Sequence, residues 1–527
     1  MSDISRNSNE SKSPQIAAAD LYDGEPAAKE TSGKGSLGGS LFATGVIAFL
    51  GLLLETVLNV LFPALMSDFG ISMGQVQWMT SGYLLVVSII MPLSSFLNRR
   101  FTFKALFLFS TIALLIGVLV SAVAPNFTVL LIGRLIQSLG AGISTPLMFN
   151  IIAEQAPRQN LGRFMGIGAL VIAIAPAVGP TMGGVFDEFL SWRWAFIAVI
   201  PFVLISMAVG MRSIRQSHPL EKVSLNTASL ILLVLGFTCL IFGFGQGGAL
   251  FGSSASALQI TMVVALLVFA VIFLVAFVRV SQRAFSPLIR LGVLKSKAFR
   301  WSFIAFGLFQ FASLGLGYVI PNFAQLGLGT SSLISGLIVV PGTIIGAIFA
   351  PLGGLVLDKF GAKRPILIGT AIALLGTVLF SVLGSSSSVI GLGAFYLIYM
   401  LGFGLAYANT QTYGLSNLPR EFNSDGVALM NTLQQLAGSI GMTILSAIIT
   451  VSEVGTKQGS KAFASATSVG AGWAFTVIAA VVLIALGVEF AAHKKRGTAT
   501  PDAETVRASE AERVERVSAK VAAVAAE

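Results

Sequence analysis

Residues 127–152 read FTVLLIGRLIQSLGAGISTPLMFNII, an apolar stretch that contains one charged side chain, Arg134. About twenty apolar residues are enough to cross a bilayer as a helix. A charge at the centre of such a helix costs about 2.5 to 3.5 kcal/mol on insertion scales. Arg134 therefore requires a charged or polar partner, a water-filled cavity, or backbone carbonyl oxygens that accept its hydrogen bonds. The stretch predicts a membrane-spanning helix that retains a charge.

Apolar stretches of this length recur along most of the chain. The 527 residues are 55% hydrophobic and only 11% charged, with a mean hydropathy of +0.86, which excludes an ordinary water-soluble fold. Lipid offers no partners to open sheet edges, so the spans must be helices of an all-α membrane protein. Polar breaks predict fourteen spans, at residues 41–66, 75–97, 104–124, 127–152, 164–186, 193–211, 226–245, 257–280, 299–324, 331–356, 365–383, 388–412, 424–450 and 471–492.

The positions of Lys and Arg predict the orientation of the chain. The net charge of +10 does not indicate a nucleic-acid-binding protein, because the basic residues are spread between the apolar stretches. Cytoplasmic loops carry the excess of Lys and Arg, so we expect a multi-pass protein of the inner or plasma membrane with both termini in the cytoplasm. The opposite connections carry only Arg193, Lys457 and Lys461. The basic connections carry Arg99, Arg100, Lys104, Arg158, Arg163, Arg212, Arg215, Lys222, Arg279, Arg283, Arg290, Lys295, Lys297, Arg300, Lys359, Lys363, Arg364, Arg420, Lys494, Lys495 and Arg496.

Few residues of the sequence suit a metal or a cofactor. The single cysteine, Cys239, lies in an apolar run, which argues against a disulfide framework or a cysteine metal cluster. His218 and His493 lie in polar connections, which argues against a histidine proton relay inside the membrane. The GxxxxGK[ST] loop of ATP-binding proteins is also missing from the sequence. We therefore expect no cofactor, no metal and no ATP site.

The sequence repeats itself at an offset of about 260 residues, which is typical of two-bundle transporters. LIQSLGAGI at 135–143 is similar to LIYMLGFGL at 397–405, and Pro63 corresponds to Pro321. The predicted organisation is a disordered cytoplasmic tail at 1–40, a six-helix bundle at 41–211, a linker with two extra transmembrane helices at 212–298, a second six-helix bundle at 299–492 and a cytoplasmic tail at 493–527. This second tail carries valines at near-helical spacing, Val506, Val514, Val517 and Val521. It is expected to be a solvated helix, a disordered segment or a partner-binding helix.

The fifth predicted span is rich in glycine and proline. It reads PAVGPTMGG at 176–184. Small residues allow close contact between helices and prolines kink them, which indicates either a moving interface between bundles or a static packing interface. The candidates for this interface are Gly168, Pro176, Gly179, Pro180, Gly183 and Gly184.

Three motifs resemble those of the major facilitator superfamily, and they follow one another on the appropriate spans. RxxQxxGAG, with Arg134, Gln137, Gly140 and Gly142, resembles its motif B, and PAVGPTMGG resembles its antiporter motif C. LLETVLNVLFP at 53–63 resembles the first-span motif of the fourteen-span drug:proton antiporter branch (the DHA2-type multidrug efflux proteins). The resemblance covers residues 41–492 and implies the major facilitator fold, export in exchange for protons, and conformational roles for these motif residues.

A fourth motif is present in only one half of the sequence. GLVLDKFGAKR, with Gly354, Asp358, Gly361 and Arg364, resembles motif A, whose charges form a network with neighbouring helix ends. At the equivalent place in the first half the chain reads SFLNRRFTFK at 95–104, with Asn or Arg where the acid is expected. The resemblance therefore implies this charge network for the second half only. An ordinary cytoplasmic charge is the alternative for Asp358.

Glu55 is the predicted proton carrier. It is the only acid deep inside a predicted span of the first half, and a low dielectric disfavours its charged form, whereas a nearby Arg134 favours it. A carboxyl group that depends on hydration and on one guanidinium group can bind a proton on one side of the membrane and release it on the other. A static, protonated Glu55 that bonds another helix is the alternative.

The expected substrate is an amphipathic or lipophilic small molecule. A cavity between the bundles would be lined by residues of the inner spans, with some of the 39 phenylalanines contributing apolar surface. The polar candidates are Asn59, Asn150, Gln310, Asn322, Tyr396, Asn409, Gln411, Asn431 and Gln434. The sequence leaves open a dedicated exporter of one metabolite or antibiotic, a uniporter or sugar symporter, and a membrane receptor or scaffold. We expect a transporter rather than an enzyme, functional as a monomer, with lipid as its surroundings.

Overall fold

The computed structural model describes residues 36–157, 161–216, 220, 225–247, 257–284, 287–419, 422–493 and 502–526, and within them we find helices and no strand. The first part contains α1 (Leu37–Phe69), α2 (Met73–Val76), α3 (Trp78–Arg100), α4 (Phe103–Ala122), α5 (Phe127–Gln155), α6 (Leu161–Phe189), α7 (Trp194–Ile197) and α8 (Ile200–Ser213). The middle part contains α9 (Thr227–Gly247), α10 (Ala257–Arg283) and the 3-10 helix η3 (Leu291–Lys295). The last part contains α11 (Lys297–Leu326), α12 (Ser332–Phe360), α13 (Lys363–Leu383), η4 (Gly384–Ser386), α14 (Val389–Ser416), α15 (Asn423–Glu453), α16 (Lys461–Ala492) and α17 (Asp502–Ala526).

Thirteen helical segments among the described residues are long and apolar enough to cross a membrane. They coincide with every predicted span except 164–186, where α6 forms a helix of 29 residues whose side chains are described only in part. The chain is thus an all-α membrane protein with the predicted spans. The first helix is longer than the predicted 41–66, because Ser36 caps its start and Gly70 ends it in the left-handed region at φ 63°.

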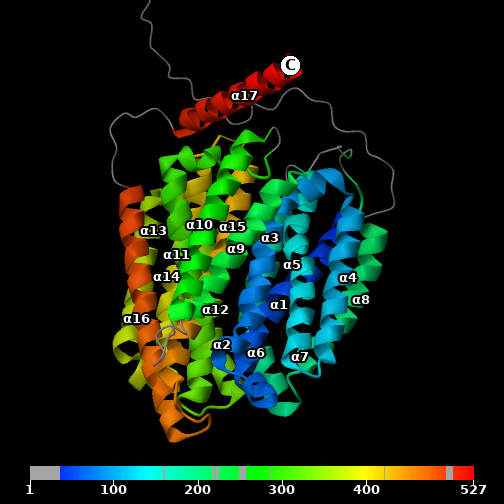
Figure 1. The fold of residues 1–527 in the computed structure, drawn as a ribbon. Coiled ribbons are helices and arrows are strands. Elements are labelled where there is room, and N and C mark those ends of the chain that lie inside the picture. The colour runs from blue at the N-terminus through cyan, green and yellow to red at the C-terminus, as the bar shows by residue number, and fades with distance from the viewer. Residues whose placement is uncertain are drawn as a thin grey trace, which may run out of the picture. The chain divides into compact units, whose positions relative to one another are not determined.

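Apart from α17, the long helices form two groups of six, with α9 and α10 as an additional pair (Figure 1). In the first group α1 packs on α5, α6 and α8, and α4 packs on α5; in the second α11 packs on α15 and α16, and α14 packs on α12 and α13. The groups meet mainly through three helix pairs, α3 with α15, α6 with α12, and α1 with α11. The second span of each group thus meets the fifth span of the other, and the two first spans meet each other.

Two glycines from each copy of the internal repeat pack in equivalent ways. A Cβ atom at Gly140 would lie 2.4 Å from the backbone of α4, and one at Gly402 would lie 2.3 Å from the backbone of α13. Similarly, a Cβ atom at Gly142 would lie 2.9 Å from Ile90 of α3, and one at Gly404 would lie 2.5 Å from the backbone of α12. Helices at these distances tolerate no side chain, so the matching letters of the two repeats reflect matching helix contacts.

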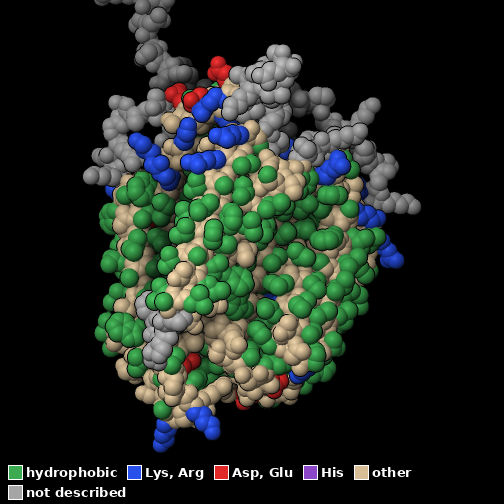
Figure 2. Space-filling model, in the orientation of Figure 1, with side chains coloured by type: hydrophobic (Ala, Val, Ile, Leu, Met, Phe, Trp, Pro, Cys, Tyr) green, Lys and Arg blue, Asp and Glu red, His purple; other side chains and the backbone are tan. Residues whose placement is uncertain are grey.

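Basic side chains gather toward one end of the molecule, while hydrophobic side chains cover the flank seen in Figure 2. We call this end the basic end. It includes Arg99 and Arg100 where α3 ends, Lys295 in η3, Lys359 where α12 ends, and Lys363 where α13 begins. The helices that end or begin here fix the direction of the others, so Gly70, at the end of α1, lies at the opposite end.

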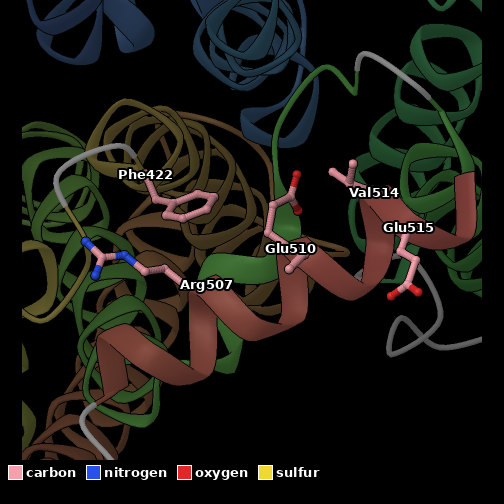
Figure 3. A pocket seen from close by; sticks show the side chains of 6 residues that line it. Phe422, Arg507, Glu510, Val514 and Glu515 are labelled. Carbon is pink, nitrogen blue, oxygen red and sulfur yellow. The ribbon is translucent and has the colours of Figure 1, made fainter. Parts of the chain in front are cut away.

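The C-terminal segment is neither wholly disordered nor wholly solvated. Its residues 502–526 form α17, and Val506 is fully buried in a cluster with Val293 and Phe299. Arg513 binds Ala284, since its Nη1 donates to the carbonyl oxygen at 2.7 Å. Figure 3 shows the pocket beside this contact, lined by Phe422, Arg507, Glu510, Ala511, Val514 and Glu515. The tail is therefore attached to η3 and to the ends of α10, α11 and α15. The side chains of Val517 and Val521 lie outside the described residues.

Replacing Val506 by Asp is expected to detach α17, because an unpaired carboxylate cannot stay in this apolar cluster. Trypsin should then cleave the purified protein after Arg507 and Arg513 at least several-fold faster than it cleaves the wild type. The exposed Val514 gives the matched control, Val514→Asp, which should leave the cleavage rate unchanged. Equal cleavage of wild type and Val506→Asp would show that α17 is not held through Val506.

Candidate functional site

Arg134 is held by three helices. Its side chain is 0% exposed, inside α5. Its Nη1 donates to Gln137 Oε1 at 2.7 Å, one turn further along α5, and its Nε donates to the carbonyl oxygen of Met79 in α3 at 3.3 Å. Gln137 is fixed in turn, because its Nε2 donates to Ser121 Oγ of α4 at 2.9 Å. The guanidinium carbon lies 4.3 Å from the centre of the Tyr83 ring, a cation–π contact. Backbone carbonyls thus supply only part of the surroundings of Arg134.

Glu55 lies beside this network on α1. Its side chain is 4% exposed, and its Oε2 is buried without a hydrogen-bond partner, as is Nη2 of Arg134. The charges of Glu55 and Arg134 are near enough to interact. Tyr83 of α3 joins its helix to α1, since its hydroxyl donates to the carbonyl oxygen of Gly51 at 2.9 Å, one turn before Glu55. The arrangement presents a carboxyl oxygen that can take up a proton, next to a guanidinium group held on one side.

The small residues of α6 press against α1 next to Glu55. A Cβ atom at Gly179 would lie 2.0 Å from Oγ1 of Thr56, and one at Gly183 would lie 2.6 Å from the carbonyl oxygen of Val57. Both glycines are therefore required for the close approach of the two helices. Because Thr56 and Val57 directly follow Glu55 in α1, any movement of α6 over α1 occurs at the level of the carboxyl group.

Another side of α6 contacts the second half of the molecule. A Cβ atom at Gly184 would lie 2.6 Å from the carbonyl oxygen of Ser332 in α12, and one at Gly336 of α12 would lie 2.3 Å from the carbonyl oxygen of Pro180. Ser332 also donates a hydrogen bond to Asp187 near the end of α6. Pro176 and Pro180 both lie within α6. The motif C residues thus lie between Glu55 on one side and the inter-half interface on the other.

Hydrogen bonds join the two halves in the part of the helices remote from the basic end. Asn322 of α11 donates through Nδ2 to the carbonyl oxygen of Asn59 at 3.1 Å, and Gln325 donates to that of Val60 at 2.8 Å. Ser81 of α3 lies 2.9 Å from Thr443 Oγ1 of α15, hydroxyl to hydroxyl. Each of these residues lies in the part of its helix that is nearer to the end opposite the basic end. The halves are therefore closed against each other there.

The nine polar residues predicted to line a substrate cavity fall into different environments. Asn59 and Asn322 contact each other across the two halves. Asn409 donates to the carbonyl oxygen of Leu405 at 2.7 Å within α14, next to Gly353 of α12. Two more are buried, Gln310 and Tyr396. Four are half-buried, Asn150, Gln411, Asn431 and Gln434. Among the hydrogen bonds of the described residues, one joins two of the nine, Asn59 and Asn322.

The motif A segment forms the turn between α12 and α13 at the basic end. Gly361 ends α12 at φ 77°, a conformation that favours glycine. The guanidinium carbon of Arg364 lies 5.5 Å from the Phe360 ring centre, and Gly354 has open space where a Cβ atom would be. The side chain of Asp358 lies outside the described residues.

Sequence reasoning missed two buried acids in the second half. Glu489 lies in α16 and is 0% exposed, and Glu453 ends α15, where its Oε1 accepts a hydrogen bond from Thr467 at 2.7 Å. Glu489 falls inside the predicted span 471–492, and this position alone could have drawn attention to it. His493 directly follows the end of α16, as the predicted polar connection requires, and its ring packs against Glu489 and Tyr413. His218 lies outside the described residues.

Comparison with known proteins identifies the family. Residues 44–442 match the family model described as Major Facilitator Superfamily, and the chain belongs to this superfamily of membrane transporters. The chain is 34% identical over 402 residues to the uncharacterized MFS-type transporter YhcA of Bacillus subtilis, with 76% of this chain and 74% of that protein covered. It is 33% identical over 401 residues to the lincomycin resistance protein LmrB of the same organism, covering 76% and 83%.

More distant matches agree with this membership. A multidrug resistance protein B homolog of Mycobacterium tuberculosis is 27% identical over 398 residues, with 75% of this chain and 73% of that protein covered. A crystal structure of a POT family transporter aligns with a TM-score of 0.61 at 15% identity, covering 87% of this chain and 96% of that one. At that identity the structural likeness shows the fold alone. Membership makes the chain a multi-pass transporter of small molecules, not an enzyme, and confirms the resemblance to the superfamily and to its drug-efflux branch.

Proposed function

We propose that this protein exports amphipathic or lipophilic small molecules, drugs and antibiotics among them, in exchange for protons. The observation that carries the proposal is the buried pair of Glu55 and Arg134, whose unpartnered atoms lie beside the α1–α6 contact. A buried acid with at least one carboxyl oxygen that makes no hydrogen bond is suited to bind and release a proton. The names of its relatives, lincomycin and multidrug resistance proteins, support drugs as substrates.

The mechanism follows from the contacts of α6. A proton on Glu55 removes a negative charge that faces Arg134, and loss of the proton restores it. Because α6 packs on α1 at Thr56 and Val57 and on α12 at Ser332, a change at Glu55 is transmitted directly to the interface between the halves. One proton that moves through 100 mV supplies about 2.3 kcal/mol, which is enough to bias two conformations of similar stability.

We test the function with the purified protein in liposomes under an imposed pH gradient. The panel is lincomycin, lipophilic cations and bile-salt-like anions. Accumulation of several chemical classes supports a polyspecific pump, whereas accumulation of lincomycin alone supports the alternative, a dedicated exporter of one antibiotic. Proton coupling would be refuted if the protein equilibrates compounds across the membrane without the gradient but accumulates none of them when the gradient is imposed.

The proposal places the basic end and both termini in the cytoplasm and treats the monomer as the functional unit. Cysteine labelling tests the orientation, after Cys239→Ser removes the single native thiol. Val454→Cys, exposed at the end opposite the basic end, should react with an impermeant maleimide in intact cells. Leu220→Cys, exposed after α8, should react only when the membrane is opened. The reverse pattern would invert the orientation and with it the direction of transport.

A further inference from the structure

Glu489 occupies a closed environment near the end of α16. Its Oε1 accepts a hydrogen bond from Oγ1 of Thr410 in α14 at 2.7 Å, and Thr410 is itself fully buried. Its Oε2 is buried without a hydrogen-bond partner and lies 3.6 Å from Nδ1 of His493, one turn further along the chain. The carboxyl group is thus fixed at one oxygen and free at the other, and the free oxygen faces a second titratable group.

His493 faces the carboxyl group as a neutral base. Its Nδ1 lies 3.0 Å from the carbonyl oxygen of Glu489, which can only accept, so Nδ1 carries the hydrogen and Nε2 is left as the basic atom. Nε2 is buried without a partner. The ring stacks on Tyr413 of α14, with 4.5 Å between ring centres. Burial lowers the pKa of His493, the charge of Lys363 at the start of α13 lowers it further, and the bond to the Glu489 carbonyl opposes both.

We propose that Glu489 and His493 together form a second proton-binding site of this transporter, in the second half of the molecule at the basic end. The inference rests on the proposed proton coupling. With one exchangeable proton on either Oε2 or Nε2 the pair is neutral overall, which suits its burial. Release of that proton leaves one negative charge, and among the described residues Lys363 is a cation whose charge acts on His493.

The position of the pair connects it to the conformational change. Lys363 directly follows the turn at Gly361 that ends α12, and α12 is the helix that contacts α6 across the halves. Movement of this turn changes the distance from Lys363 to the pair, and so the affinity of the pair for its proton. Each half of the molecule then carries one proton site, Glu55 in the first and the Glu489 pair in the second.

The limiting accumulation ratio in liposomes tests the proposal, because this ratio depends on the number of coupled protons and not on the amount of active protein. Each coupled proton contributes about tenfold per unit of pH gradient. Glu489→Gln and His493→Gln should each lower the ratio about tenfold per pH unit. Gly487→Ala, at an exposed position of α16 with open space around it, is the control and should keep the wild-type ratio. Wild-type ratios in both variants would overturn the second site, whereas a wild type without accumulation would refute the proposed function itself.

A spectroscopic measurement tests the pair without transport. The chain has only two histidines, so His218→Gln leaves His493 as the single source of histidine signals in ¹⁵N-labelled protein. Coupled groups shift each other by more than about one pH unit, so the titration midpoint of His493 should move by at least that much when Glu489→Gln is added. Glu489→Asp should restore part of the difference. An unchanged midpoint in Glu489→Gln would show that the two groups titrate independently and would overturn the proposal.

Discussion

Proteoliposomes that contain the Glu55→Gln protein are expected to show no accumulation of substrate under an imposed pH gradient. Gln has the size of Glu and can form hydrogen bonds, but it does not titrate, so the charge facing Arg134 no longer changes during transport. The loss is complete, unlike the smaller loss expected of Glu489→Gln, because Glu55 is the site that lies at the α1–α6 contact, and a constant charge there no longer ties the movement of the halves to the proton. Inner and outer concentrations should then become equal. The measurement is the steady-state ratio of a transported drug, with and without the pH gradient.

Two further variants separate loss of coupling from loss of fold. Glu55→Asp keeps the titratable group and should retain partial accumulation. Arg134→Ala removes the guanidinium that bonds Gln137 and faces Glu55, and should impair transport as well. If Glu55→Gln still sustains accumulation at the wild-type ratio, Glu55 is not the proton carrier, and the role passes to another acid of the chain.

Replacing Gly183 by Leu is expected to slow transport severely while the protein still inserts into the membrane. A Cβ atom at this position would lie 2.6 Å from the carbonyl oxygen of Val57, so even a small side chain forces α6 away from α1. Overpacking costs about 1–3 kcal/mol, and a bias of that size between two conformations lowers the transport rate by the order of tenfold to a hundredfold. Drug efflux from cells that express equal amounts of each protein gives the rate.

The control for this variant is Gly487→Leu. Gly487 is exposed on α16 and has open space around its Cβ position, so the same substitution adds the same apolar bulk without a contact. It should transport at the wild-type rate. Equal and full activity of both variants would show that the α1–α6 contact does not take part in the transport cycle.

The spans could be predicted from the sequence because they depend on local composition. A run of about twenty apolar residues has few alternatives to a helix in a bilayer, and thirteen of the fourteen predicted spans coincide with helices long and apolar enough to cross it. The exact ends were harder to predict. Ser36 and Gly70 extend α1 beyond its apolar part, since a cap satisfies backbone groups whatever the hydropathy of the flanking turn.

The site could be predicted in part, for the same reason. Arg134 and Glu55 were found because a charge inside an apolar run is conspicuous in one dimension. Glu489 was missed although it also lies in a predicted span. It falls near the end of the apolar run, where a charged residue is taken as the boundary between the helix and the water. The contacts of His493 were missed because the sequence cannot show that Tyr413 covers its ring.

The sequence by itself determined the class of this protein: its helices, its internal repeat, and the motifs of a major facilitator. The tertiary structure decided which residues meet. Only there do Tyr83 and Gln137 hold Arg134, Asn59 and Asn322 join the two halves, and Thr410 bind Glu489. The physical reason is that hydropathy is a property of each segment, whereas a hydrogen bond between helices depends on their rotation and separation, which the packing of glycines such as Gly183 and Gly402 sets.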